Sequence, residues 1–103
     1  MQTIWITGGS SGIGFATAKE FINNNWQVVI SSSNKIKLES AKKKLELNNK
    51  KNLVHAIVCD ISSKNNVDET INSIEKNIGK IDIALLNASA YSPNKNKIYE
   101  HLW

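Results

Sequence analysis

Residues 7–14, Thr-Gly-Gly-Ser-Ser-Gly-Ile-Gly, form a glycine-rich segment between a strand-like run and a helix-like run. The preceding residues, Thr3–Thr7, are β-branched or aromatic, which is typical of a buried strand. Apolar residues at helical spacing then predict a helix over Ile13–Asn24. A strand that turns through glycines into a helix directs free backbone N–H groups and the positive end of the helix dipole to one place. The segment therefore predicts a phosphate-binding site.

Each glycine of this segment has its own expected role. Gly8 can make a tight turn after the strand, Gly12 leaves room for a pyrophosphate against the backbone, and Gly14 lets the helix approach the strand. The spacing Gly-x-x-x-Gly-x-Gly differs from the common dinucleotide motif, and no Lys-Ser/Thr pair follows as in a Walker A loop. It resembles the first strand-to-helix turn of the short-chain dehydrogenase/reductase family, and this resemblance covers nearly the whole chain. The alternative, a serine- and glycine-rich linker, fits the flanking strand and helix poorly.

The rest of the chain alternates between strand and helix signals. Gly79 is expected to end the last helix, and Ser62 or Ser63 to begin it. The expected elements after the first helix are a strand at Trp26–Ser31, a helix at Lys35–Leu47, a strand at Leu53–Cys59, that last helix, and a strand at Ile81–Leu86.

This alternation predicts an α/β fold, a Rossmann-type doubly wound parallel sheet that is truncated after the fourth strand. The expected strand order is 3-2-1-4. We expect a single NAD(P)-binding domain over residues 1–103, with an irregular tail over 88–103 that has a candidate helix start near Lys97.

Composition excludes several classes of protein. All 13 basic residues are lysines, and clusters such as Lys42–Lys44 fit a solvated helix face better than a nucleic-acid site, so no nucleic-acid partner is expected despite the net charge of +4. No apolar run is long enough to cross a membrane, and the first residues already form a strand, so neither a membrane partner nor a signal peptide is expected. The single cysteine, Cys59, fits a reducing compartment and predicts a cytoplasmic protein.

The end of the second strand is where the adenine ribose of a dinucleotide is expected. An NAD site typically has a carboxylate there, whereas this chain has Ser31, Ser32 and Ser33. These hydroxyls, the Asn34 amide and Lys35 could bind a 2′-phosphate, which favours NADP over NAD as cofactor. The same residues could instead only shape a turn and cap a helix.

The third and fourth strand ends add further candidates. Asp60 could accept a hydrogen bond from the adenine amino group, as the family resemblance implies, or could only cap the turn. Asn87 and Ala88 match the family's Asn-Asn-Ala-Gly motif beside the cofactor, whereas Leu86 and Ser89 depart from it. The candidate cofactor-binding residues are Gly8, Ser10, Ser11, Gly12, Ile13, Gly14, Ser32, Ser33, Asn34, Asp60, Ile61, Asn87 and Ala88.

No catalytic residue and no metal ligand is predicted. The family's catalytic Ser and Tyr-x-x-x-Lys lie on a fifth strand and its helix, which are expected beyond residue 103. Tyr91 and Lys95 have that spacing, but Pro93 between them disfavours the helix that the chemistry requires. His55 and His101 have no partner at metal-ligand spacing.

The resemblance implies NAD(P)-dependent hydride transfer between a carbonyl and an alcohol. This chain would carry the cofactor-binding part and be inactive alone, with a substrate bound only if a C-terminal half is supplied. The alternatives are a non-catalytic NADP-binding module and a non-functional gene fragment.

Overall fold

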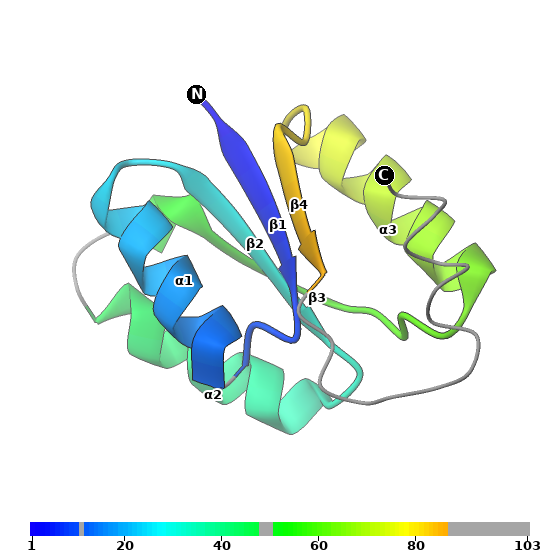
Figure 1. Cartoon of the computed structure of the whole chain (residues 1–103), viewed down its shortest axis with the longest axis horizontal. Helices are drawn as coiled ribbons and strands as arrows, with labels where there is room; N and C mark the ends of the chain where they lie inside the picture. Colours follow the sequence, from blue (N-terminus) through cyan, green and yellow to red (C-terminus); the bar gives the residue numbers. More distant parts are fainter. Residues whose placement is uncertain (11, 48–50, 87–103) are drawn as a thin grey trace.

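The computed structural model describes residues 1–10, 12–47 and 51–86 of the chain. Four strands form one parallel sheet in the order β3-β2-β1-β4, and three helices connect them (Figure 1). The elements are β1 (Thr3–Thr7), α1 (Gly12–Asn23), β2 (Gln27–Ser32), α2 (Lys35–Glu46), a 3-10 turn (Lys51–Leu53), β3 (Val54–Val58), α3 (Lys64–Asn77) and β4 (Ile83–Leu86). The predicted fold class and strand order are confirmed. The predicted tail over 88–103 lies outside the described residues.

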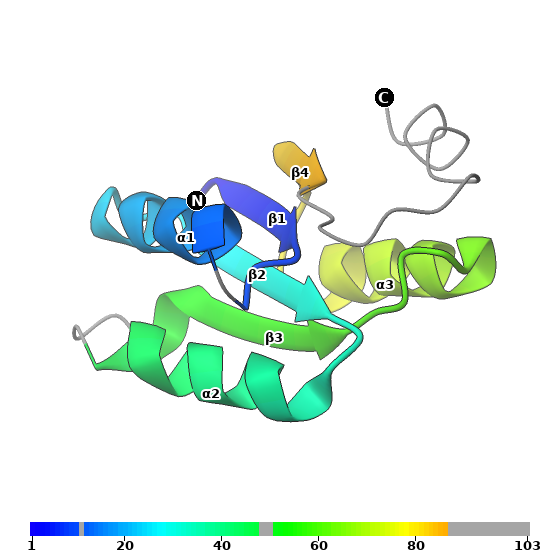
Figure 2. The ribbon, with the colours of Figure 1, turned by 60° about the horizontal axis from the view of Figure 1, so that its bottom comes forward.

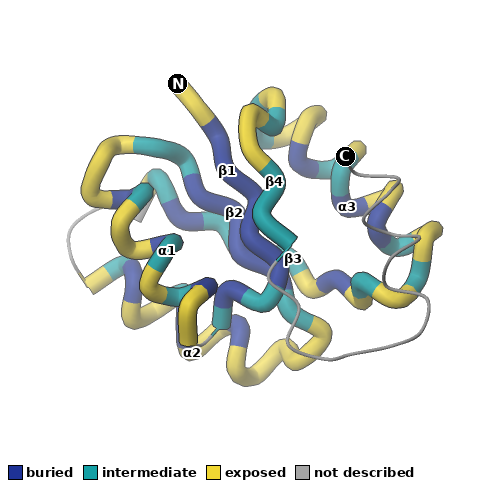
Figure 3. Tube along the Cα trace, in the orientation of Figure 1, coloured by how far each residue is buried: buried dark blue, intermediate teal, exposed yellow. Residues whose placement is uncertain are grey.

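The helices cover the sheet on two sides, with α1 and α2 on one face and α3 on the other (Figure 2). Because strand side chains alternate between faces, each strand contributes to both layers. On the first face, Ile6 and Ile30 pack with the apolar sides of α1 and α2, whereas on the second face Trp5 and Val29 pack with α3. Every residue of the central strand β1 is buried (Figure 3), as a strand covered on both faces requires.

Local signals explain where the helices begin and end. The Asn34 side chain caps α2 by accepting from the Lys37 N–H at 3.0 Å, and the Ser63 hydroxyl caps α3 by accepting from the Asn66 N–H at 3.2 Å. The turn after α1 contains Asn25 at φ 65°, as the asparagine run there predicts. Of the two serines considered for α3, Ser63 is therefore the cap.

The outer edge of the sheet is less covered than its centre. Within the described part of the chain, β4 pairs only with β1, and its four apolar residues are exposed or half-buried. A cavity of about 330 Å³ lies between β4 and α3, with Trp5, Ile71 and Ala84 among its lining residues. No helix among the described residues is long and apolar enough to cross a membrane.

Candidate cofactor-binding site

The predicted site residues that the structure describes lie where β1, β2 and β3 end. Because the strands are parallel, these three ends meet at one edge of the sheet, together with the start of α1 (Figure 1). The cavity between β4 and α3 is lined instead by the start of β4 and the last turns of α3. Ser11, Asn87 and Ala88 lie outside the described residues, so their place in the site stays a prediction.

Two glycines of the turn have left-handed backbone conformations, as the predicted tight turn requires. Gly8 has a φ of 69°, and its N–H donates to the Ser31 carbonyl at 2.8 Å. Gly12 has a φ of 59°, and a Cβ added to it would meet no atom within 4 Å. The backbone at Gly12 is therefore uncovered, which fits the close approach of a phosphate.

The start of α1 suits an anion. The first N–H groups of an α-helix have no intrahelical partner, and the first turn of α1 carries no acidic side chain that would repel a phosphate. Ser10 is half-buried beside this turn, and Gly14 is buried on the side of α1 that faces the sheet, as predicted. Ile13 is 76% exposed, so its apolar side chain is open to a ligand bound at the turn.

Gly9 has a structural role that the sequence analysis missed. A Cβ on Gly9 would lie 2.7 Å from Ile30 Cγ2 and 2.9 Å from Ile30 Cβ. The turn thus packs directly on the end of β2 and has no room for a side chain there. The Gly-Gly pair directly after a strand was the available signal, but the contact with Ile30 depends on how β1 and β2 pair.

The serines at the end of β2 have different environments. Ser31 is 1% exposed and its hydroxyl accepts a hydrogen bond from the Trp5 indole N–H, so Ser31 is not available to a ribose. The Ser32 Oγ accepts from the Asn34 N–H at 3.1 Å, and Asn34 caps α2. Ser32 therefore shapes the turn and Asn34 caps the helix, as the alternative interpretation of these residues predicted. Ser33 is exposed.

Polar groups nevertheless remain for a ligand at this strand end. The Ser32 oxygen accepts a hydrogen bond within the turn, and its hydroxyl hydrogen can still donate to a ligand. The Asn34 side chain accepts through its oxygen, and its NH₂ group can likewise donate. Lys35 is exposed at the first position of α2, whose first turn carries no acidic residue. The electrostatic environment therefore suits an anion here too.

Asp60 caps the turn after β3. Its Oδ1 accepts from the Ser62 N–H at 3.0 Å and from the Ser62 hydroxyl at 2.6 Å, and these hydrogen bonds lower the pKa of the Asp60 carboxyl. The carboxylate is exposed, so the turn role leaves it accessible. Ile61 is half-buried against the cluster under α3. Contact of either residue with a cofactor stays a prediction.

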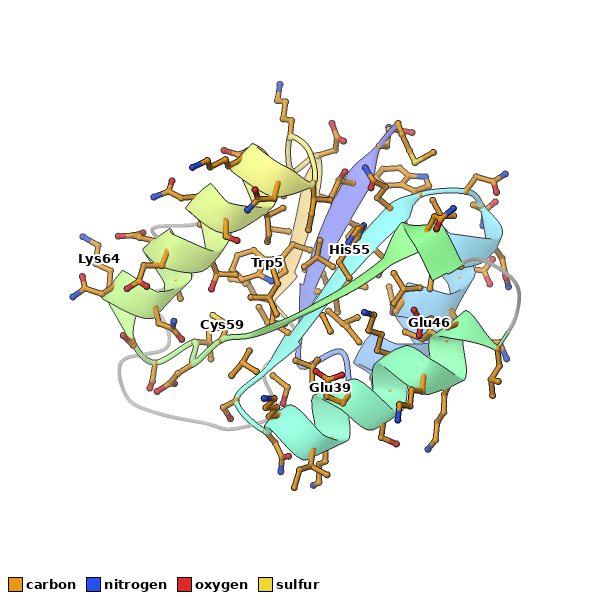
Figure 4. The ribbon with its side chains drawn as sticks, turned by 180° about the vertical axis from the view of Figure 1, so that it is seen from behind. Trp5, Glu39, Glu46, His55, Cys59 and Lys64 are labelled. Atoms are coloured by element: carbon orange, nitrogen blue, oxygen red, sulfur yellow. The ribbon has the colours of Figure 1, made fainter. Side chains whose placement is uncertain are left out.

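His55 lies in β3, and Cys59 directly follows this strand. Burial is the main cause that lowers the pKa of His55, whose Nε2 lies 3.3 Å from Gln27 Oε1. Burial also raises the pKa of the Cys59 thiol, which lies under α3 (Figure 4). No group of three His, Cys, Asp or Glu side chains within residues 1–10, 12–47 and 51–86 could hold a metal ion.

Comparison with known proteins decides the family. The model of the short chain dehydrogenases matches residues 2–102. The chain belongs to the short chain dehydrogenase family.

The sequence relatives in this family are longer proteins. An uncharacterized oxidoreductase of Schizosaccharomyces pombe is 33% identical over 87 residues, which are 84% of this chain and 34% of the relative. A probable NADP-dependent mannitol dehydrogenase of Yarrowia lipolytica is 40% identical over 86 residues, or 81% of this chain and 29% of the relative. The chain thus spans about a third of the length of these short chain dehydrogenases.

Solved structures agree on the fold. The 2-keto-3-deoxy-D-gluconate dehydrogenase of Streptococcus agalactiae has a TM-score of 0.81 at 26% identity, covering 88% of this chain and 34% of that chain. Menthone neomenthol reductase of Mentha piperita has the same TM-score of 0.81 at 18% identity, covering 98% of this chain and 37% of that chain. The family's Rossmann-like sheet is therefore present here, while the Tyr91 and Lys95 pair lies outside the described residues.

Proposed function

We propose that this chain forms the dinucleotide-binding part of an NAD(P)-dependent oxidoreductase that transfers a hydride between a carbonyl and an alcohol. The observation that carries the proposal is the turn between β1 and α1, where Gly8 and Gly12 are left-handed and the backbone at Gly12 is open. The family match and the oxidoreductase names of the relatives support the type of reaction.

The residues of this chain would bind and orient the cofactor. The pyrophosphate would lie against Gly12 and the first N–H groups of α1, with Ser10 and Ser11 beside it. The bound cofactor supplies or accepts the hydride. The remaining predicted contacts are Ile13 at the turn, Ser32, Ser33 and Asn34 for the adenine ribose, Asp60 and Ile61 for the adenine, and Asn87 and Ala88 on the nicotinamide side.

We propose NADP rather than NAD as the cofactor. The residues at the end of β2 place hydroxyl and amide donors, and no carboxylate, where a ribose 2′-phosphate would lie. Lys35 adds an exposed positive charge at the start of α2. In line with this, one relative is named as a probable NADP-dependent enzyme, and structures of an actinorhodin polyketide ketoreductase and of a Pseudomonas aeruginosa oxidoreductase are described with NADPH.

We further propose that catalysis needs more of the family domain than these 103 residues. Among the described residues, the ends of β1, β2 and β3 carry no pair of a tyrosine and a lysine of the kind that the family uses for proton transfer.

We also propose a cytoplasmic location. The buried Cys59, which forms no disulfide, supports it, since such thiols persist in reducing compartments.

The proposal is tested by measuring binding of NADPH and NADH to the 103-residue protein, by titration and by the shift in melting temperature. We expect NADPH to bind at least about tenfold more tightly than NADH. Gly12→Ala should weaken NADPH binding about tenfold or more, because its Cβ would occupy the space assigned to the pyrophosphate. We expect no turnover of carbonyl substrates by this protein.

Lys19→Ala is the matched control, since Lys19 is exposed on α1 away from the turn. It should bind NADPH like the natural protein. A folded protein that binds neither nucleotide would refute the proposed function, and equal affinity for both would refute the preference for NADP.

A further inference from the structure

A hydrogen bond between two buried side chains joins β1 and β2 close to the strand ends from which the glycine turn starts, on the face of the sheet that α3 covers. The Trp5 indole N–H donates to the Ser31 hydroxyl, and Trp5 and Ser31 are 0% and 1% exposed. Trp5 belongs to β1 and lies between the sheet and α3 (Figure 4), and Ser31 is near the end of β2. Neither side chain reaches solvent, so each depends on the other for this hydrogen bond.

The same serine also holds the glycine turn through its backbone. The Ser31 carbonyl accepts from the Gly8 N–H at 2.8 Å and from the Gly9 N–H at 3.4 Å. Gly9 in addition packs against Ile30, the residue before Ser31. The first two N–H groups of the turn are therefore committed to β2, which leaves the N–H groups at the start of α1 for an anion.

We propose that Trp5 and Ser31 are positioning residues for the glycine turn. Through its hydroxyl Ser31 is fixed by Trp5, and through its carbonyl it fixes Gly8 and Gly9, so that the turn is already ordered before a ligand arrives. The effect on cofactor affinity rests on the proposed function, whereas the ordering of the turn does not.

The physical reason is that the buried Ser31 hydroxyl needs another hydrogen-bond partner when the Trp5 indole N–H is absent. If the indole N–H is removed, the Ser31 hydroxyl loses its donor in a dry environment. To find another partner for this hydroxyl, the end of β2 has to shift, and the Ser31 carbonyl that holds Gly8 and Gly9 shifts with it. The free protein should therefore open more often at the turn, and a cofactor would have to close it upon binding.

Trp5→Phe and Ser31→Ala test this directly, with amide hydrogen exchange as the readout. In each single variant, exchange at the Gly8 and Gly9 amides should be about tenfold faster relative to the amides of the β1–β2 ladder. In the double variant Trp5→Phe/Ser31→Ala, both polar partners are gone, and protection at Gly8 and Gly9 should return toward that of the natural protein. Loss of packing alone would not produce this recovery.

Trp26→Phe is the matched control, because Trp26 packs edge-on against Phe21, 5.0 Å between ring centroids, on the other face of the sheet. It should leave the Gly8 and Gly9 amides unchanged. Equal exchange at Gly8 and Gly9 in the natural protein and Trp5→Phe, or uniform acceleration of all amides, would overturn the proposal.

A second measurement separates this inference from the proposed function. Trp5→Phe should raise the Kd for NADPH about fivefold or more, although Trp5 is buried under α3 and has no surface for a ligand to touch. If the natural protein binds no NADPH, the proposed function fails, and the exchange data still decide whether Trp5 and Ser31 order the turn.

Discussion

Asp82 and Thr3 are joined by two reciprocal hydrogen bonds at the start of the β1–β4 pair. The Asp82 N–H donates to the Thr3 carbonyl at 2.9 Å, and the Thr3 N–H donates to Asp82 Oδ2 at 2.8 Å. The two residues are 79 positions apart in the sequence. Their contact immediately precedes the first pair of the register, Ile4 with Ile83, and so aligns the edge strand with the central strand.

We expect Asp82→Ala to lower the free energy of unfolding by about 1–2 kcal/mol, because the N–H of the buried Thr3 loses its acceptor. Asp82→Asn should cost less, since its amide oxygen can still accept. Urea denaturation measures both values. Asp68→Ala, at an exposed position of α3, is the control and should change stability by less than about 0.5 kcal/mol. An Asp82→Ala variant as stable as this control would contradict the role of the pair.

Thr3→Val should stabilise the protein. Thr3 is fully buried, and its hydroxyl oxygen has no hydrogen-bond partner among the described residues. Valine has nearly the same shape and lacks the unpaired polar group, so we expect a gain of about 1 kcal/mol. Thr17→Val, at a half-buried position of α1, is a matched control with little expected gain. A lower urea midpoint for Thr3→Val than for the natural protein would show that the hydroxyl is satisfied.

The sequence predicted most of the fold because its signals are local. Apolar periodicity and capping residues such as Ser63 placed the helices within one or two residues of their observed bounds. The last strand begins later than predicted, at Ile83, because the two residues before it take part in hydrogen bonds that involve side chains. The Ile81 N–H donates to Glu75 Oε2 at 3.3 Å, and Asp82 binds Thr3.

The site was predicted less completely because parts of it depend on contacts between strands. The left-handed conformations of Gly8 and Gly12 follow from the motif itself. Whether Ser31 faces a ligand or the interior depends on its position in β2, and its side chain points into the interior on the α3 face, toward Trp5. The need for glycine at position 9 arises from Ile30 on the neighbouring strand, which no local pattern reveals.

Gly9→Ala should destabilise the protein by about 1–3 kcal/mol, because its Cβ would collide with the side chain of Ile30. Ile30 is fully buried in its strand, so neither group can move away easily. In an Ile30→Ala background, Cγ2 is absent and the cost of Gly9→Ala should be smaller. A double-mutant cycle by urea denaturation measures this coupling. Strictly additive effects of the two substitutions would contradict the predicted collision.

The free energy of unfolding should decrease when the pH is lowered from 7.5 to 5.5, in part because of His55. Burial, and then the positive charge of Lys42, lower the pKa of His55 in the folded protein from the ordinary value near 6.5. In this range the unfolded chain therefore binds more protons than the folded protein, so the free energy of unfolding increases as the pH increases. The stability that depends on neutral His55 is lost progressively as the pH decreases below about 6.5.

His55→Gln should reduce this pH dependence, and Lys42→Gln should move the pKa of His55 upward, closer to its ordinary value. Urea denaturation across the pH range measures the first effect. The imidazole titration followed by NMR in a His101→Gln background, where His55 is the one remaining histidine, measures the second. A His55 pKa above 6.5 in the folded protein would reverse the sign and contradict the prediction.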